Sequence, residues 1–203
     1  AIVDPELTYT VPSVVTLSTG LDALNQAFEA VWNHNRSEPT TIMAARAIGL
    51  AFKAIPMLEV DLENYEARKL ISEASVLAGL CISQTRTAVC HSISYPLTTH
   101  FGIAHGLACA YTMGAVANIV LEDAPSVLLE AAHLNGISSA DALVEKLHDV
   151  LGATDLYKHC HAKLPNIQTL LALQGEMHTQ NRSDNFILEV DEVMLSHILQ
   201  QSR

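Results

Sequence analysis

Apolar residues recur at steps of three and four along most of this chain, and this spacing restricts it to a helical fold. In "GLDALNQAFEAVWN", after a start signal at Ser18-Thr19, the positions Leu21, Leu24, Phe28 and Val31 fall on one helical face. Similar patterns cover 40–55, 63–84, 105–121, 126–135, 139–151, 166–178 and 190–200, separated by Pro56, Pro125, Gly136, Gly152 and Pro165. The sequence therefore predicts an all-α, multi-helix bundle of about seven to nine helices.

The start of the chain differs from the rest. "AIVDPELTYTVPSVV" is rich in β-branched residues and contains two prolines, which predicts an extended lead-in over 1–17. A helical domain is expected to follow over 18–203. The segments 63–84 and 105–121 are apolar on most faces, so we expect them to be central helices. A length of 203 residues suits one domain better than two.

The composition excludes several classes of binding partner. The net charge of -11 carries no basic stripe, so we expect no nucleic-acid partner. No apolar run approaches the roughly 20 residues of a membrane span, and the first residues do not resemble a signal peptide, so we expect no membrane partner and a cytoplasmic location. The four cysteines, Cys81, Cys90, Cys109 and Cys160, lack C-x-x-C spacing, which favours free, buried thiols.

A nucleotide-binding motif is absent. The nine glycines are isolated from one another, so no glycine-rich loop brings backbone N–H groups against a phosphate. The pattern also shows no alternation of strands and helices that would hold a dinucleotide. We therefore expect that this chain does not bind a nucleotide by itself.

Two polar residues share a face of the first helix. Asp22 and Gln26 are four positions apart, so their side chains project one turn above the other and two oxygen ligands can meet there. The alternative is that Asp22 only stabilises the start of the helix, where an acid interacts well with the helix dipole and the free N–H groups.

Three histidines gather in "CHSISYPLTTHFGIAHG". We expect His91 on a short helix and His105 at the start of the next long one, with a loop containing proline and glycine that turns both rings toward one point. Neutral imidazoles and a carboxylate are a usual ligand set for zinc or ferrous iron. The third histidine of this stretch, His100, is not needed for this ligand set. The alternative is that these histidines are ordinary polar residues at helix ends.

Four stretches resemble a known family. "DPELTYTVP", "TGLDALNQAFEA", "EARKLISEASVLAG" and "CHSISYPLTTHFGIAHGLACA" are similar, in order and spacing, to the iron-containing (group III) metal-dependent alcohol dehydrogenases, and within them to phosphonoacetaldehyde reductase-like members. The resemblance implies the C-terminal helical domain of the dehydroquinate synthase-like type. It also implies an N-terminal domain, absent from this chain, that binds most of the NAD(P) in a full-length enzyme.

The resemblance also implies a metal site. The family's ligands fall on Asp22, His91 and His105, and its fourth ligand, usually histidine, falls on Gln26. An amide oxygen is a poorer ligand than imidazole for Fe²⁺ or Zn²⁺. Gln26 therefore binds weakly, binds through water or lines the site, and all three alternatives stay open. The set of Asp22 and two histidines also resembles the three-ligand site of glycerol dehydrogenases.

Three further residues are candidates for the reaction itself. Tyr95 and His100 are candidates for proton delivery, although the pKa of about 10 of an ordinary tyrosine makes it a poor relay near neutrality. Arg86 is a candidate for binding an anionic substrate group, or else a cation at a helix end. We expect Arg182 to be a structural tie, and the histidines of 159–161 to be solvated surface.

The predicted function is an NAD(P)-linked alcohol dehydrogenase or aldehyde reductase domain, with phosphonoacetaldehyde as one candidate substrate. Two alternatives stay open: a glycerol-dehydrogenase-like polyol oxidoreductase, and a non-catalytic helical module that binds a metal or another protein. We expect a small-molecule aldehyde or alcohol, the N-terminal domain of the same protein and a second copy of the chain as partners. By itself the chain should show no dehydrogenase activity.

Overall fold

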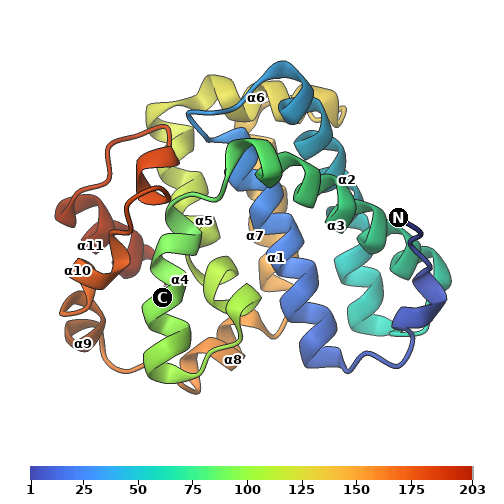
Figure 1. Cartoon of the computed structure of the whole chain (residues 1–203), viewed down its shortest axis with the longest axis horizontal. Helices are drawn as coiled ribbons and strands as arrows, with labels where there is room; N and C mark the ends of the chain where they lie inside the picture. Colours follow the sequence, from blue (N-terminus) through green and yellow to red (C-terminus); the bar gives the residue numbers. More distant parts are fainter. Residues whose placement is uncertain (203) are drawn as a thin grey trace.

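The computed structural model describes residues 1–202, and Figure 1 shows that its regular structure is helical. Two 3₁₀ helices, η1 (Pro5–Thr8) and η2 (Ser183–Asn185), accompany the α-helices of this described part: α1 (Ser13–Val31), α2 (Glu38–Val60), α3 (Tyr65–Thr85), α4 (Val89–Phe101), α5 (His105–Asp123), α6 (Pro125–Leu134), α7 (Ala140–Gly152), α8 (Leu156–His161), α9 (Ile167–Leu171), α10 (Gln174–Met177) and α11 (Glu192–Gln201). The prediction of an all-α bundle is confirmed.

Helices α1 and α5 form the centre of the bundle. Helix α1 packs against α2 and α3 on one side and against α5 on the other, and α4 lies along α5 (Figure 1). Helix α5 is buried along nearly its whole length, from Gly106 to Val120, because small residues such as Ala108 and Ala110 let neighbours approach on every side. The central position predicted for 105–121 is confirmed.

Three expectations about the elements were wrong. The lead-in over 1–17 is not extended throughout, because η1 covers 5–8 and α1 already begins at Ser13, directly after Pro12. Pro56 does not end a helix; α2 continues for one more turn, and Leu58 in that turn is buried. The pattern over 63–84 is not central, because α3 buries only one face, whereas α2 is the more buried helix.

Helix α2 is long and apolar enough to cross a membrane by length and composition, contrary to the expectation from sequence. The bent pair of α5 and α6 passes the same test, although the two helices differ in direction by 109°. In α2, 61% of the most apolar window is buried inside this chain. Its apolar surface therefore contributes to the core of the bundle.

A close contact between backbones sets the distance between α1 and α5. A Cβ atom added to Gly106 would lie 1.9 Å from the carbonyl oxygen of Ser18 and 2.9 Å from the Cβ of Asp22. Only glycine fits there, because any side chain would overlap the backbone of α1. The first turn of α5 is thereby held beside the turn of α1 that carries Asp22.

Replacing Gly106 with alanine tests this contact. We expect Gly106→Ala to lower the free energy of unfolding by about 1–3 kcal/mol, because backbone atoms must move apart. Gly79→Ala is the matched control: it adds the same atom inside α3, where no atom lies within 4 Å. It should stabilise the chain by up to about 1 kcal/mol. Urea unfolding measures both, and equal effects would contradict the proposed contact.

Candidate metal centre

Three helices bring the candidate ligands together. His91 lies in the first turn of α4, His105 is the first residue of α5, and Asp22 lies in the middle of α1. Pro96, which we expected in the loop, lies inside α4, and the loop itself is only Gly102–Ala104. Gly102 has φ 63°, a left-handed conformation that ends α4 and lets the chain reverse into α5.

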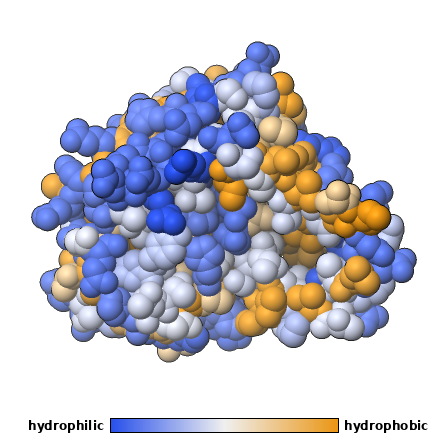
Figure 2. Space-filling model, in the orientation of Figure 1, coloured by the Kyte–Doolittle hydropathy of each residue, from blue (hydrophilic) through white to orange (hydrophobic). Residues whose placement is uncertain are grey.

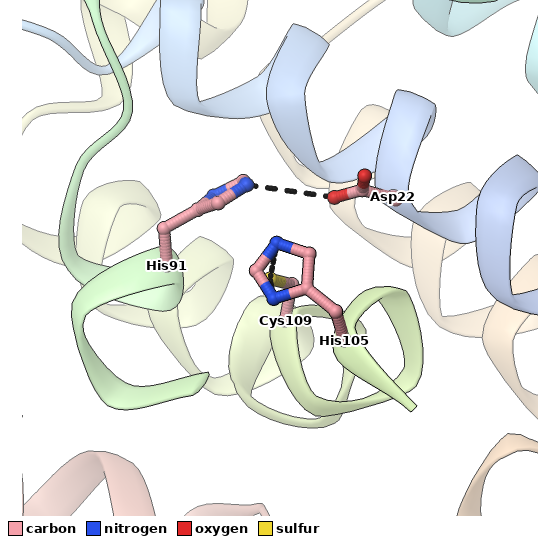
Figure 3. A group of neighbouring side chains, drawn as sticks. All are labelled: Asp22, His91, His105 and Cys109. Atoms are coloured by element: carbon pink, nitrogen blue, oxygen red, sulfur yellow. Dashed lines mark hydrogen bonds and ion pairs between the residues drawn. The ribbon is translucent and has the colours of Figure 1, made fainter. Parts of the chain in front are cut away.

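The ligand atoms of Asp22, His91, His105 and Cys109 all lie within 4.8 Å of one another. Figure 3 shows the two imidazole rings and the carboxylate converging on one space, with the sulfur behind the ring of His105. His91 Nε2 is 3.4 Å from Asp22 Oδ1, and the two imidazole centroids are 5.3 Å apart, with 64° between the ring planes. The structure thus brings together the predicted ligands Asp22, His91 and His105, and Gln26 lies beside them, hydrogen-bonded to Asp22.

A buried glutamate orients His91. Glu29 is fully buried, and its Oε2 lies 2.7 Å from His91 Nδ1. The same carboxylate accepts the backbone N–H groups of Ala88, at 2.6 Å, and of His91, at 3.1 Å. These two groups belong to the start of α4, which has no side-chain cap of its own. Glu29 therefore caps α4 and turns Nε2 of His91 toward Asp22.

The two imidazoles are in different electrostatic surroundings. Burial disfavours a charged His91, but the Glu29 carboxylate and the contact with the Asp22 carboxylate outweigh burial and raise the pKa of His91. A positive charge is thus favoured at the point where Nε2 of His91 faces Asp22, whether a ring proton or a bound metal ion supplies it. Burial, with repulsion from His91, lowers the pKa of His105 although Asp22 opposes this. A neutral His105 keeps a lone pair for a metal ion.

The two oxygens of Asp22 differ. Oδ2 accepts a hydrogen bond of 3.0 Å from Gln26 Nε2, whereas Oδ1 is buried and, within the described residues, makes only the long ion-pair contact of 3.4 Å with His91 Nε2. A buried carboxylate oxygen with so long a contact is costly unless a cation satisfies it better. Carboxylate and imidazole donors are also a usual set for Zn²⁺ or Fe²⁺. The residues therefore fit a divalent metal ion, with Gln26 steadying Asp22 through its amide nitrogen.

The two residues predicted for proton delivery, Tyr95 and His100, lie at different distances from the cluster. The ring of Tyr95 lies at the edge of the cluster, 6.0 Å from that of His105. His100 is on the last turn of α4, exposed, and bonded to Glu176 at 2.8 Å. The contacts of His100 do not connect it to the cluster. Its proposed role in proton transfer therefore gains no support from the geometry.

The structure places a different arginine at the site from the one predicted. Arg86 is exposed at the end of α3, and no contact in the described part of the chain joins its side chain to the cluster. The guanidinium of Arg182 lies 4.6 Å from the centre of the Tyr95 ring, and its charge helps to lower the pKa of His105. The expectation that Arg182 is only a structural tie missed this position.

Hydrogen bonds fix the segment that carries Arg182. On one side, Ser92 in α4 donates to the carbonyl of Met177 at 2.6 Å and accepts from the N–H of Thr179 at 2.9 Å. On the other side, Asn185 donates to the carbonyl of Thr87 at 2.9 Å. Because both anchors lie at the start of α4, Arg182 is held near Tyr95 of the same helix.

Two residues of the centre had a signal in the sequence that we did not use. Glu29 is seven positions after Asp22, and therefore on the same face of α1, and its neighbours from Ala27 to Trp32 are all apolar. Cys109 is four positions after His105, a spacing that puts two ligand atoms side by side on a helix. Arg182 had no such signal, because it lies 77 positions from His105 and approaches only through the fold.

Fold and site define an all-helical domain in which three helices bring together a set of side chains that fits a divalent metal. Residues 16–195 match the model of the Fe-containing alcohol dehydrogenase family, C-terminal, so the chain belongs to this family and contains its C-terminal domain. The resemblance inferred from sequence is confirmed.

Individual proteins are similar to this chain in sequence or in structure. The chain is 38% identical over 120 residues to long-chain-alcohol dehydrogenase 1 of Geobacillus thermodenitrificans and 42% over 100 residues to phosphonoacetaldehyde reductase of Streptomyces viridochromogenes. These matches cover 57% and 48% of this chain, but only 30% and 25% of the relatives. A sulfoacetaldehyde reductase from Bifidobacterium kashiwanohense, solved in complex with NAD⁺, superposes with a TM-score of 0.84 at 34% identity, covering 99% of this chain and 53% of that one. The chain thus spans about half or less of each relative.

Changing Glu29 to glutamine tests its role as an anchor. Glu29→Gln removes the charge and turns a donor toward groups that are themselves donors, so we expect a loss of about 2–4 kcal/mol in the free energy of unfolding. Metal affinity should fall by about 10- to 100-fold, because His91 loses its orienting partner. Chemical denaturation and metal titration measure these changes.

The matched control is Glu66→Gln, the same substitution on α3, where Glu66 is exposed and 4.0 Å from Lys69. It should change stability by less than about 1 kcal/mol. If the two variants behave alike, Glu29 does not anchor the site.

Proposed function

We propose that this chain is the metal-binding half of an NAD(P)-dependent enzyme that interconverts a small aldehyde and the corresponding alcohol. The observation that carries the proposal is the convergence of the buried Oδ1 of Asp22 with two imidazoles, where within the described residues this oxygen makes only a long contact of 3.4 Å, with His91 Nε2. Membership of the Fe-containing alcohol dehydrogenase family supports it. A divalent ion held there supplies Lewis-acid polarisation of the substrate oxygen during hydride transfer.

The chain's own residues hold and orient the parts of this site. Asp22, His91 and His105 are the proposed ligands, Gln26 steadies the carboxylate, and Glu29 fixes the ring of His91. Tyr95, at the rim, offers a hydroxyl that can donate a hydrogen bond to the substrate oxygen. The proposal keeps Fe²⁺ and Zn²⁺ as the candidate ions, since both accept carboxylate and imidazole ligands.

The proposed partner of this half is the N-terminal nucleotide-binding domain of the same protein. Exposed apolar side chains gather where the chain begins: Ile2, Val3, Leu7, Val14 and Val15. In Figure 2 most orange atoms lie in the right half of the face, where Figure 1 places the N-terminus and α3. Exposed apolar groups of this kind are typical of surfaces that another domain or subunit covers. A second copy of the chain, as in a homo-oligomer, is a further proposed partner.

The proposed substrate is a short aldehyde that carries an anionic group. Arg182 has no carboxylate in ion-pair distance within residues 1–202 and lies over Tyr95 at the rim of the metal cluster. A guanidinium can grip phosphonate or sulfonate oxygens through two parallel hydrogen bonds. The names of two relatives, phosphonoacetaldehyde reductase and sulfoacetaldehyde reductase, support this class of substrate. A polyol dehydrogenase would use the same ligands but has no need of this cation.

We also propose a cytoplasmic location. All four cysteines are free and buried, and thiols persist in a reducing compartment.

Metal content tests the proposed function. The chain, purified without chelators, should contain about one equivalent of a divalent ion, and His91→Ala should lose it, because the ring supplies a ligand. Elemental mass spectrometry measures both, with His148→Ala, a histidine that bonds Asn118, as the matched control that keeps its metal. NAD(P)H oxidation should be found only in the longer protein that includes the nucleotide-binding domain. Turnover by the 203-residue chain alone would contradict the two-domain proposal.

The two arginines separate the possible anion-binding positions. In the longer protein, Arg182→Gln should raise the KM for phosphonoacetaldehyde by about 30- to 100-fold, the loss expected for hydrogen bonds to a charged group, and should leave propanal reduction within about threefold. Arg86→Gln should change neither. Steady-state kinetics with both aldehydes measures these effects. If Arg86→Gln raises the KM for phosphonoacetaldehyde and Arg182→Gln does not, the anion binds at Arg86, as predicted from the sequence.

A further inference from the structure

The thiol of Cys109 lies inside the metal cluster. Its Sγ is 3.7 Å from His105 Nε2 and 4.0 Å from Nδ1, and it also interacts with His91. Cys109 is fully buried, one turn after His105 on the same face of α5 (Figure 3). The four ligand atoms of the cluster come from a carboxylate, two imidazoles and this sulfur.

We infer that Cys109, as a thiolate, is the fourth protein ligand of the metal ion, in the place left open by Gln26. This inference rests on the proposed metal-dependent function and deepens it. The amide nitrogen of Gln26 already donates to Asp22 Oδ2, so this residue serves the carboxylate. Oδ1 of Asp22 and Nε2 of the almost wholly buried His91, which are 3.4 Å apart, face the same space as the sulfur.

The distances suit a small ion. A tetrahedral zinc ion with bonds of about 2.0–2.3 Å separates its ligand atoms by roughly 3.3–3.8 Å. The separations in the cluster, up to 4.8 Å, are slightly wider, and small side-chain rotations close the difference. Burial raises the pKa of the Cys109 thiol, and His91 opposes this rise. A bound dication displaces such a proton, since a coordinating thiol is deprotonated.

A sulfur ligand changes which ion the site prefers. Thiolates are soft donors and select zinc over hard, oxygen-preferring ions, whereas a site of carboxylate and imidazole alone also accepts ferrous iron. The inferred set of one carboxylate, two imidazoles and one thiolate therefore favours Zn²⁺. Zinc with four ligands still admits a substrate oxygen, because it can expand to five-coordinate during the reaction.

Cobalt provides a direct optical test on the full chain. Co²⁺ replaces Zn²⁺, and a bond from thiolate sulfur to Co²⁺ produces a charge-transfer absorption in the near ultraviolet that nitrogen and oxygen ligands do not produce. We expect one equivalent of Co²⁺ with this band in the unmodified chain. Cys109→Ser and Cys109→Ala should lose the band and bind Co²⁺ about 100-fold or more weakly, beyond the 10- to 100-fold cost of losing an orienting partner.

Cys160→Ser is the matched control, because Cys160 is equally buried and its thiol instead contacts the carbonyl of Leu107. This variant should keep the band. Circular dichroism melting shows whether the Cys109 variants fold; if they do not, the band in the unmodified chain still decides the question. One equivalent of cobalt without that band overturns the thiolate ligand but leaves the metal site and the proposed function standing. No cobalt binding by the unmodified chain overturns both.

Discussion

The arrangement of the site depends on one buried carboxylate. Glu29 is removed from water, and a lone buried charge would be strongly destabilising. The fold compensates with the two N–H groups at the start of α4 and with Nδ1 of His91, so that one carboxylate satisfies the start of a helix and a ring nitrogen together. Because the start of α4 and the ring of His91 share this partner, α4 cannot shift along α1 without uncovering the charge.

Helix α1 sets the positions of the other two helices of the site. Asp22, Gln26 and Glu29 are four and three positions apart, so they follow one another along the same face over two turns. Glu29 fixes α4 at one end of this stretch, and Gly106 brings α5 against the backbone at the other end, beside Asp22. The two histidines therefore meet at the same carboxylate although they lie on different helices.

The sequence predicted those parts of the structure that depend on local spacing. The helical class, the buried helix at 105–121 and the meeting of Asp22, His91 and His105 could be predicted, because each follows from periodicity or from a resemblance to known motifs. Pro56 was misjudged because the packing of Leu58 outweighs the hydrogen bond that a proline removes. The helix begins earlier than the β-branched residues predict, because the carbonyl of the N-cap residue Pro12 already accepts hydrogen bonds from the N–H groups of Val15 and Thr16.

Arg182 shows why the rest of the site was not predictable from sequence. Its segment has no regular structure beyond η2, and its position depends on Ser92 and Asn185, whose hydrogen bonds reach partners more than 80 positions away. Contacts between residues so far apart produce no periodic pattern in the sequence. They also separate two properties of the site: the candidate ligands lie on packed helices, whereas the cation at the rim, Arg182, lies on a loop. A change in this loop can therefore alter the charge at the rim without disturbing Glu29 or the metal ligands, which offers a physical route to different substrates on one metal centre.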